Sequence, residues 1–175
     1  MFNNILVPTD GSDHANKAVR VASDLAAKYD ARVVFLHVLL SSAEVSDLVN
    51  LIDVMKLPDD LRDELEQIEK LGKSALIGGR SLAMVLPVRS EVLVAVGDTL
   101  LDEAERVAKD DGVTKIGRKW KQGAPATCIL SSADEEKADL IVMGTRGLGD
   151  FKGLLVGSVS HKVSHLAPCT CITVK

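Results

Sequence analysis

Short apolar runs alternate along this chain with amphipathic stretches, and this alternation limits the fold more than any other feature. The runs 5–7, 33–36 and 139–143 are dominated by Val, Ile and Leu, which is typical of strands buried on both faces. The segments between them are long enough for right-handed crossovers. The sequence therefore predicts an α/β fold, a parallel sheet covered by helices on both faces.

Helix signals stand between and after these runs. Ser12 is a candidate N-cap, Pro125 lies where a helix would begin, and Pro168 closes the last helix. The buried side of that last helix is predicted at Leu155, Val159, Val163 and Leu166. Two further strands are predicted, a half-exposed one over 113–121 and a terminal one over 170–174.

The stretch 88–96 fits two structures. Val92, Val94 and Val96 alternate as in a strand, but Val92 and Val96 also begin a helical face that continues to about Asp110. The helix is favoured because its phase continues unbroken through 99–109, although Gly97 interrupts it with a poor helix former.

The middle of the chain, around 41–96, is read as an atypical helical segment within a single domain that spans 1–175. Pro58 and the apolar residues after it predict a helix that ends at Gly78, with spaced ion pairs such as Glu66 with Lys70.

Composition excludes several function classes. The net charge of −4 gives no general attraction for nucleic acid, and no run approaches the ~18 apolar residues of a membrane span. The three cysteines are an odd number in a chain without a secretory signal, which argues against a disulfide framework and indicates a cytoplasmic protein.

A glycine-marked loop follows the strand 139–143. Gly144 and Gly147 stand at its start. Nine residues separate Gly147 from Gly157, which opens the last helix with Ser158, Val159 and Ser160. Glycines let backbone N–H groups approach phosphate oxygens, a helix N-terminus favours anions, and the two serines can add hydroxyl donors. The alternative is that these are ordinary turn and capping glycines.

This pattern resembles the nucleotide loop of ATP-binding universal stress proteins. Further landmarks of that family occur in its order: ILVPTDGS at 5–12, LHV at 36–38, ADLIVMG at 138–144 and APC at 167–169. The resemblance implies a Rossmann-like sheet of five parallel strands in the order 3-2-1-4-5, with ATP, or AMP or ADP, across the loops after the first and fourth strands. It also implies Mg²⁺ on the phosphates.

The resemblance also implies roles for single residues. Asp10 would contact the ribose or the adenine, Pro8 and Thr9 would line that wall, and the backbone of Val38 would meet the adenine. The residues expected to enclose ribose and phosphates are Gly144, Arg146, Gly147, Gly157, Ser158, Val159 and Ser160.

Other interpretations compete at two places. Asp10 can simply bond its own Asp-Gly turn or assist the helix start. His161 and His165, with Cys169 and Cys171, have a spacing that suggests zinc, but the two histidines lie opposite the apolar stripe of their helix, which favours a solvated face.

The function expected from these patterns is that of a nucleotide-dependent switch or partner-binding module in a stress response, with an unknown protein partner. The strand 170–174 is expected at a sheet edge, where it would pair with a second copy in a homodimer. A nucleotide-free dimeric module and a slow ATPase are the alternatives. No Walker-type Gly-Lys-Ser/Thr stands near the loop, so no catalytic residue is assigned.

Overall fold

A computed structural model describes residues 1–39, 59, 62–63, 66–67, 70, 90–148 and 157–175. Five strands form one sheet in the order β3-β2-β1-β4-β5, and all neighbouring pairs are parallel. The strands are β1 (Asn4–Pro8), β2 (Arg32–Leu39), β3 (Ile116–Gln122), β4 (Leu140–Gly144) and β5 (Thr170–Val174). The predicted sheet and its strand order are confirmed.

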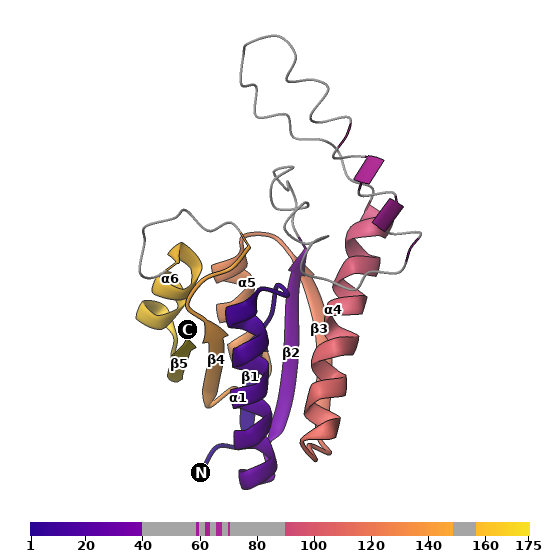
Figure 1. Cartoon of the computed structure of the whole chain (residues 1–175). Coiled ribbons are helices and arrows are strands. Elements are labelled where there is room, and N and C mark those ends of the chain that lie inside the picture. The colour runs from indigo at the N-terminus through magenta and orange to yellow at the C-terminus, as the bar shows by residue number, and fades with distance from the viewer. Residues whose placement is uncertain (40–58, 60–61, 64–65, 68–69, 71–89, 149–156) are drawn as a thin grey trace.

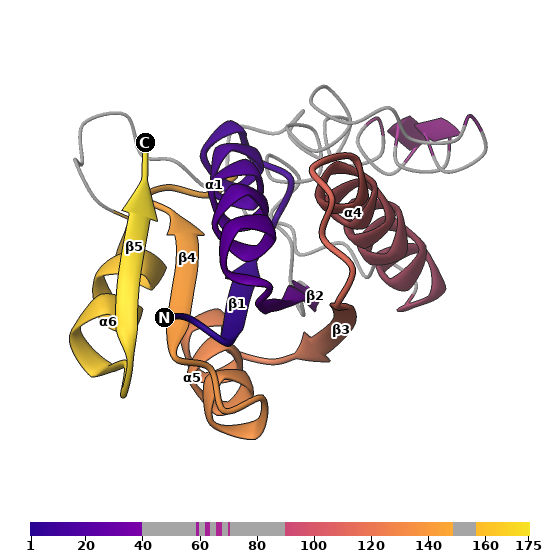
Figure 2. The same ribbon diagram turned by 90° about the horizontal axis from the view of Figure 1, so that it is seen from below.

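Helices cover both faces of the sheet, as predicted. They are α1 (Asp13–Tyr29), α4 (Ser90–Asp110), α5 (Pro125–Glu135) and α6 (Ser158–Leu166). Seen along the sheet, α1 and α4 lie on one face and α5 and α6 on the other (Figures 1 and 2). None of the helices that the structure describes is long and apolar enough to cross a membrane.

Two apolar layers hold the helices to the sheet. Phe35 and Leu101 belong to the layer under α1 and α4, and Leu6 and Ile141 belong to the layer under α5 and α6. These four side chains are at most 1% exposed, so burial of apolar surface on both faces stabilises the sheet.

The helices begin where the sequence predicts. Ser12 is the N-cap of α1, and its hydroxyl accepts a hydrogen bond from the Ala15 backbone N–H at 3.3 Å. Pro125 occupies the first turn of α5, and Gly157 is the N-cap of α6. The helical interpretation of 92–110 is also confirmed, since α4 runs through Gly97 without a break.

Three expectations differ from the structure or lie outside the described part. The strand predicted from 113 begins at Ile116, because the Val113 N–H bonds the Ala108 carbonyl at 2.9 Å and the buried Val113 packs against the end of α4. Leu166 is 53% exposed, because it ends α6 beside the edge strand, where no described element covers it. Leu155 and most of the predicted helix after Pro58 lie outside the described residues. Glu66 and Lys70 from that helix form an ion pair of 3.7 Å.

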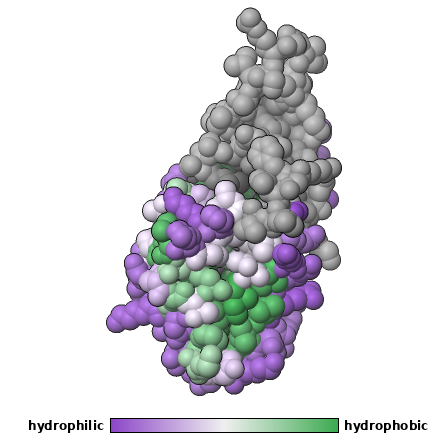
Figure 3. Space-filling view, turned by 90° about the vertical axis from the view of Figure 1, so that its left-hand side faces the viewer, coloured by the Kyte–Doolittle hydropathy of each residue, from purple (hydrophilic) through white to green (hydrophobic). Residues whose placement is uncertain are grey.

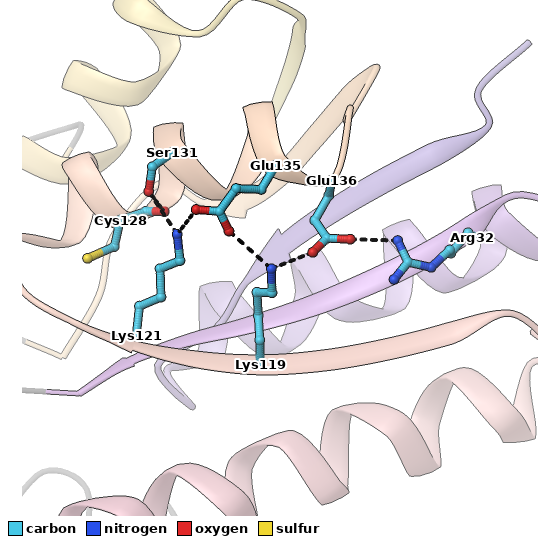
Figure 4. Close-up of polar contacts among 7 residues, drawn as sticks. All are labelled: Arg32, Lys119, Lys121, Cys128, Ser131, Glu135 and Glu136. Carbon is cyan, nitrogen blue, oxygen red and sulfur yellow. Dashed lines mark hydrogen bonds and ion pairs between the residues drawn. The ribbon is translucent and has the colours of Figure 1, made fainter.

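The edge at β3 is lined with charged groups. Lys119 and Lys121 of β3 reach Glu135 and Glu136 at the end of α5, and Glu136 also bonds Arg32 at 2.7 Å (Figure 4). The hydrogen bond to Glu136 raises the pKa of Lys119, while hydrogen bonds from Lys119 and Arg32 hold the pKa of Glu136 below its ordinary value. Lys119 and Glu136 are therefore ionised together at neutral pH.

The opposite edge, β5, is mainly apolar. Cys171, Ile172 and Val174 are half-buried, and Leu166 of α6 is exposed beside them. A view onto this side of the molecule shows hydrophobic residues gathered over its lower part (Figure 3). The terminal strand thus lies at the sheet edge, as predicted.

Candidate functional site

One cavity of about 300 Å³ lies beyond the carboxyl ends of the strands. Strand order reverses between β1 and β4, and a parallel sheet leaves a crevice at such a point. All eleven residues predicted for the site line this cavity: Pro8, Thr9, Asp10, Val38, Gly144, Arg146, Gly147, Gly157, Ser158, Val159 and Ser160. The sequence therefore predicted which residues gather here. What they bind is a separate question.

Part of the wall was not predicted. Leu93 and Val96 of α4 and Pro125 and Ile129 of α5 also line the cavity. Their apolar side chains follow the ordinary pattern of buried helix faces, so nothing local marks them as site residues. For Pro125 a topological signal existed, because it follows the carboxyl end of β3 by a short turn and must lie at this end of the sheet.

Asp10 joins the two loops that bound the cavity. Its Oδ1 accepts hydrogen bonds from the backbone N–H and the hydroxyl of Ser12, at 3.1 and 2.7 Å. Its Oδ2 accepts one from the Leu148 N–H at 3.1 Å, across to the glycine loop. The interpretation that Asp10 bonds its own turn is thus confirmed, and the carboxylate also fixes the distance between the loops.

Close approach explains the glycines of the loop. A Cβ on Gly147 would lie 2.3 Å from Asp10 Oδ2, and one on Gly144 would lie 2.8 Å from the Ala15 backbone nitrogen. One on Gly157 would lie 3.0 Å from the Thr145 carbonyl oxygen. Each glycine therefore lets this loop pack against its neighbours, and Gly157 is also a helix cap.

The two serines at the start of α6 are not equivalent. Ser160 is 4% exposed, and its hydroxyl lies 2.7 Å from the Thr145 carbonyl oxygen and 3.0 Å from that of Gly157. Both carbonyls can only accept, so the single hydroxyl hydrogen of Ser160 is used within the protein. The expectation that this hydroxyl serves as a donor to phosphate is therefore wrong for the arrangement seen here. Ser158 is exposed, and its hydroxyl bonds no residue in the described part of the chain.

Two histidines form hydrogen bonds to the loops that bound the site. The Nδ1 atom of His37 lies 2.9 Å from the Thr9 carbonyl oxygen, and His37 is among the residues that line the cavity. Burial lowers the pKa of His37, while the hydrogen bond to Thr9 and the charge of Asp10 act in the opposite direction. His14 places its Nδ1 2.9 Å from the Thr145 hydroxyl, which ties α1 to the glycine loop.

The zinc interpretation finds no support in these positions. His161 and His165 are exposed, as the solvated-face interpretation predicts, and burial raises the pKa values of the Cys169 and Cys171 thiols. Within the described ranges, no group of three or more His, Cys, Asp or Glu side chains is arranged to hold a metal ion.

The chain has clear relatives among known proteins. The model of the "Universal stress protein family" matches residues 1–175. A universal stress protein of Thermus aquaticus is 34% identical to the chain, over 100% of both sequences.

Solved structures share the fold. A universal stress protein in complex with cAMP gives a TM-score of 0.59 at 24% identity, with 99% of this chain and 96% of that one covered. The universal stress protein of Archaeoglobus fulgidus in complex with dAMP gives 0.60 at 20% identity, with 99% and 98% covered.

Proposed function

The chain belongs to the universal stress protein family, and from this premise we propose that it binds ATP, or AMP or ADP, in the cavity above β1 and β4. The observation that carries the proposal is the convergence of all eleven predicted residues on this one cavity. Two structural neighbours bind cAMP and dAMP, which are both adenine nucleotides.

The two ends of the cavity suit the two ends of a nucleotide. Val38, Leu93 and Ile129 form an apolar wall near β2, α4 and α5, which is suitable for a planar base. Gly144 to Gly147 and the N-terminus of α6 form the other end, where backbone N–H groups and the helix dipole favour phosphate. In this proposal Mg²⁺ enters the site bound to the phosphates of the nucleotide.

The proposed role is binding and not efficient hydrolysis. Asp10 is the one carboxylate among the described residues that line the cavity, and it accepts three hydrogen bonds from the protein. A carboxylate held in this way is suited to positioning a loop or a ribose. We propose that nucleotide occupancy changes the contacts between the two loops and so controls how the protein meets a protein partner.

The proposal includes a homodimer formed through β5. This strand lies at the edge of the sheet with half-buried Ile172 and Val174 beside unpaired backbone groups. The same strand of a second copy can pair with it across a two-fold axis and cover the apolar surface of Figure 3. The proposed compartment is the cytoplasm, since all three cysteines are free thiols in the described part of the chain.

Thermal unfolding tests nucleotide binding directly. A ligand that binds only the folded protein, at about 100 times its Kd, stabilises it by about 2.7 kcal/mol, which is roughly 5–11 °C in Tm for a domain of this size. We expect Mg-ATP to raise the Tm by that amount and Mg²⁺ alone to leave it unchanged. An unaltered melting curve at millimolar ATP would favour the nucleotide-free dimeric module instead.

A further inference from the structure

A second, smaller cavity of about 230 Å³ lies beside the first. The described residues that line it are His14, Thr145, Arg146 and Lys175. Thr145 and Arg146 also line the larger cavity, so the two cavities share part of a wall. The proposed nucleotide uses one side of this wall and leaves the other side unassigned.

The pairing of the last two strands brings these residues together. Their register places Gly144 opposite Val174. Thr145 and Lys175 therefore leave the sheet side by side, and the Thr145 N–H donates to the Val174 carbonyl oxygen at 2.8 Å. In Figure 2 the end of the chain lies beyond the tip of β5, on the side of the sheet that α1 covers. The smaller cavity thus lies between the start of α1 and the carboxyl ends of β4 and β5.

Hydrogen bonds hold the wall at Thr145 in place. The Thr145 hydroxyl donates to the Val174 carbonyl oxygen at 3.2 Å, because a carbonyl oxygen can only accept. This uses the one hydrogen of the hydroxyl, so Thr145 accepts the 2.9 Å bond from His14 Nδ1. The Thr145 hydroxyl then has no hydrogen left for a ligand. Recognition of a ligand in this cavity falls to the basic side chains.

The charge of the cavity is opposite to that of the whole protein. The chain has a net charge of −4, yet none of the described residues that line this cavity is acidic. Arginine and lysine are cationic at neutral pH, and histidine joins them when it is protonated. His14 also stands in the first turn of α1, where the positive end of the helix dipole favours an anion. Asp13 of the same turn is exposed and is not among the lining residues.

A phosphate group is the anion that suits this cavity. Arginine offers a planar fork of N–H donors and lysine a point charge, and proteins use both for phosphate. A water molecule takes up about 30 Å³, so a cavity of about 230 Å³ has room for a phosphate group and its water. The glycine loop, where the phosphates of the nucleotide are proposed to bind, begins on the other side of the shared wall.

We propose that the smaller cavity is a second anion site, which binds a phosphate group through Arg146 and Lys175, with His14 contributing when it is protonated. Two sources share this chemistry, namely inorganic phosphate and the outermost phosphate of a nucleotide held in the larger cavity. The site goes beyond the proposed nucleotide binding, since inorganic phosphate needs no nucleotide.

Titration of the ¹⁵N-labelled full chain with inorganic phosphate locates the site by NMR. Sodium chloride keeps the ionic strength constant, so that general screening does not change during the titration. The amide resonances of His14, Arg146 and Lys175 should shift together along one binding curve. Shifts at Gly157 in the larger cavity without shifts at Lys175, or no saturable shift at all, would overturn the inference.

Variants of Lys175 measure its contribution. Lys175→Gln should raise the Kd for phosphate about 2- to 5-fold, the range for one exposed ion pair, and Lys175→Arg should bind phosphate as the parent does. Lys28→Gln is the matched control, because it makes the same charge change in the last turn of α1, about 20 Å from His14 along the helix. Its Kd should equal that of the parent. Equal Kd values in Lys175→Gln and Lys28→Gln refute the site.

Saturation with nucleotide separates the two sources. Phosphate that still binds in the presence of AMP and of Mg-ATP identifies a site for separate phosphate. Phosphate that is displaced by Mg-ATP but not by AMP identifies a site for the outermost phosphate of the nucleotide. Displacement by AMP shows that phosphate had occupied the larger cavity, and overturns the inference. If neither nucleotide binds, the proposed function fails, and the comparison of the variants decides the anion site by itself.

Discussion

Replacing Gly97 by alanine tests how tightly α4 packs on the site. In an exposed helix interior this change stabilises a protein by about 1 kcal/mol, because glycine is a poor helix former. At Gly97 the new Cβ would stand 2.9 Å from His37 Cδ2 and 3.3 Å from Leu39 Cδ2. The His37 ring is buried and bonded to Thr9, so it cannot turn away as the end of a long side chain would.

The two contributions have opposite signs. Overpacking of a well-filled interior costs about 1–3 kcal/mol, so the net change in the free energy of unfolding is a loss of about 0–2 kcal/mol. A loss of 1 kcal/mol lowers the Tm of a domain of this size by roughly 2–4 °C. Urea unfolding of the parent and of Gly97→Ala measures this difference, and ATP titration of both shows whether displacement of the His37 ring also weakens binding.

A double-mutant cycle isolates the contact. In a His37→Ala background the ring is absent, so Gly97→Ala should become stabilising by up to about 1 kcal/mol, its helix-propensity value. The reasoning would be refuted if Gly97→Ala stabilises the parent by that full amount, or if its effect is the same in both backgrounds.

Three further predictions follow from the same contacts. Gly157→Val should weaken ATP binding by at least about tenfold and lower the Tm without preventing folding, because a Cβ would already lie 3.0 Å from the Thr145 carbonyl oxygen, in the loop where phosphate is proposed to bind. Calorimetry that gives parent-like affinity contradicts the phosphate role of this loop. Ile172→Lys places a charge in the proposed β5 contact, so the mass measured by light scattering should fall from about twice 18.7 kDa to that of the monomer. A dimer that persists in this variant shows that the interface lies elsewhere. Stability should fall as pH drops below 6.5, because burial lowers the pKa of His37 and the unfolded chain then binds a proton that the folded protein does not. Urea unfolding between pH 5 and 8 should show this loss of stability in the parent and a smaller loss in His37→Asn. The charge of Asp10 acts against the effect of burial and reduces the loss. Equal pH dependence in the two proteins contradicts the assignment of the effect to His37.

The sequence predicted those parts of the molecule whose causes are local. Ser12 caps α1 through its side-chain hydroxyl, Pro125 begins α5 through the fixed backbone angle of its ring, and the apolar residues Ile5 to Val7 are buried in the sheet. The glycine loop of the site was found from its own residues, Gly144, Gly147 and Gly157, whereas the roles of Pro8, Thr9, Asp10 and Val38 were expected from the resemblance to universal stress proteins.

What the sequence could not predict depends on contacts between distant segments. Leu93 lines the cavity because α4 packs beside β2, and its own neighbours in sequence give no sign of this. Gly97 weakened the helix prediction because its explanation, the ring of His37, lies 60 positions earlier in the chain. Leu166 was predicted to be buried from helical periodicity, which cannot reveal that the sheet ends beside it.

The two edges of the sheet have unlike chemistry, and this determines how large an assembly can become. On β3, Lys119 and Lys121 pair with α5 on one face (Figure 4), and Arg118 pairs with Asp102 of α4 on the other. A strand from another molecule therefore meets charged side chains that already have partners on both faces. If two copies join through β5, each presents at its outer end a β3 whose Arg118, Lys119 and Lys121 are engaged in ion pairs, with Trp120 exposed between them. Both copies of β5 are then used within the two-fold pair, so a filament cannot continue through this edge.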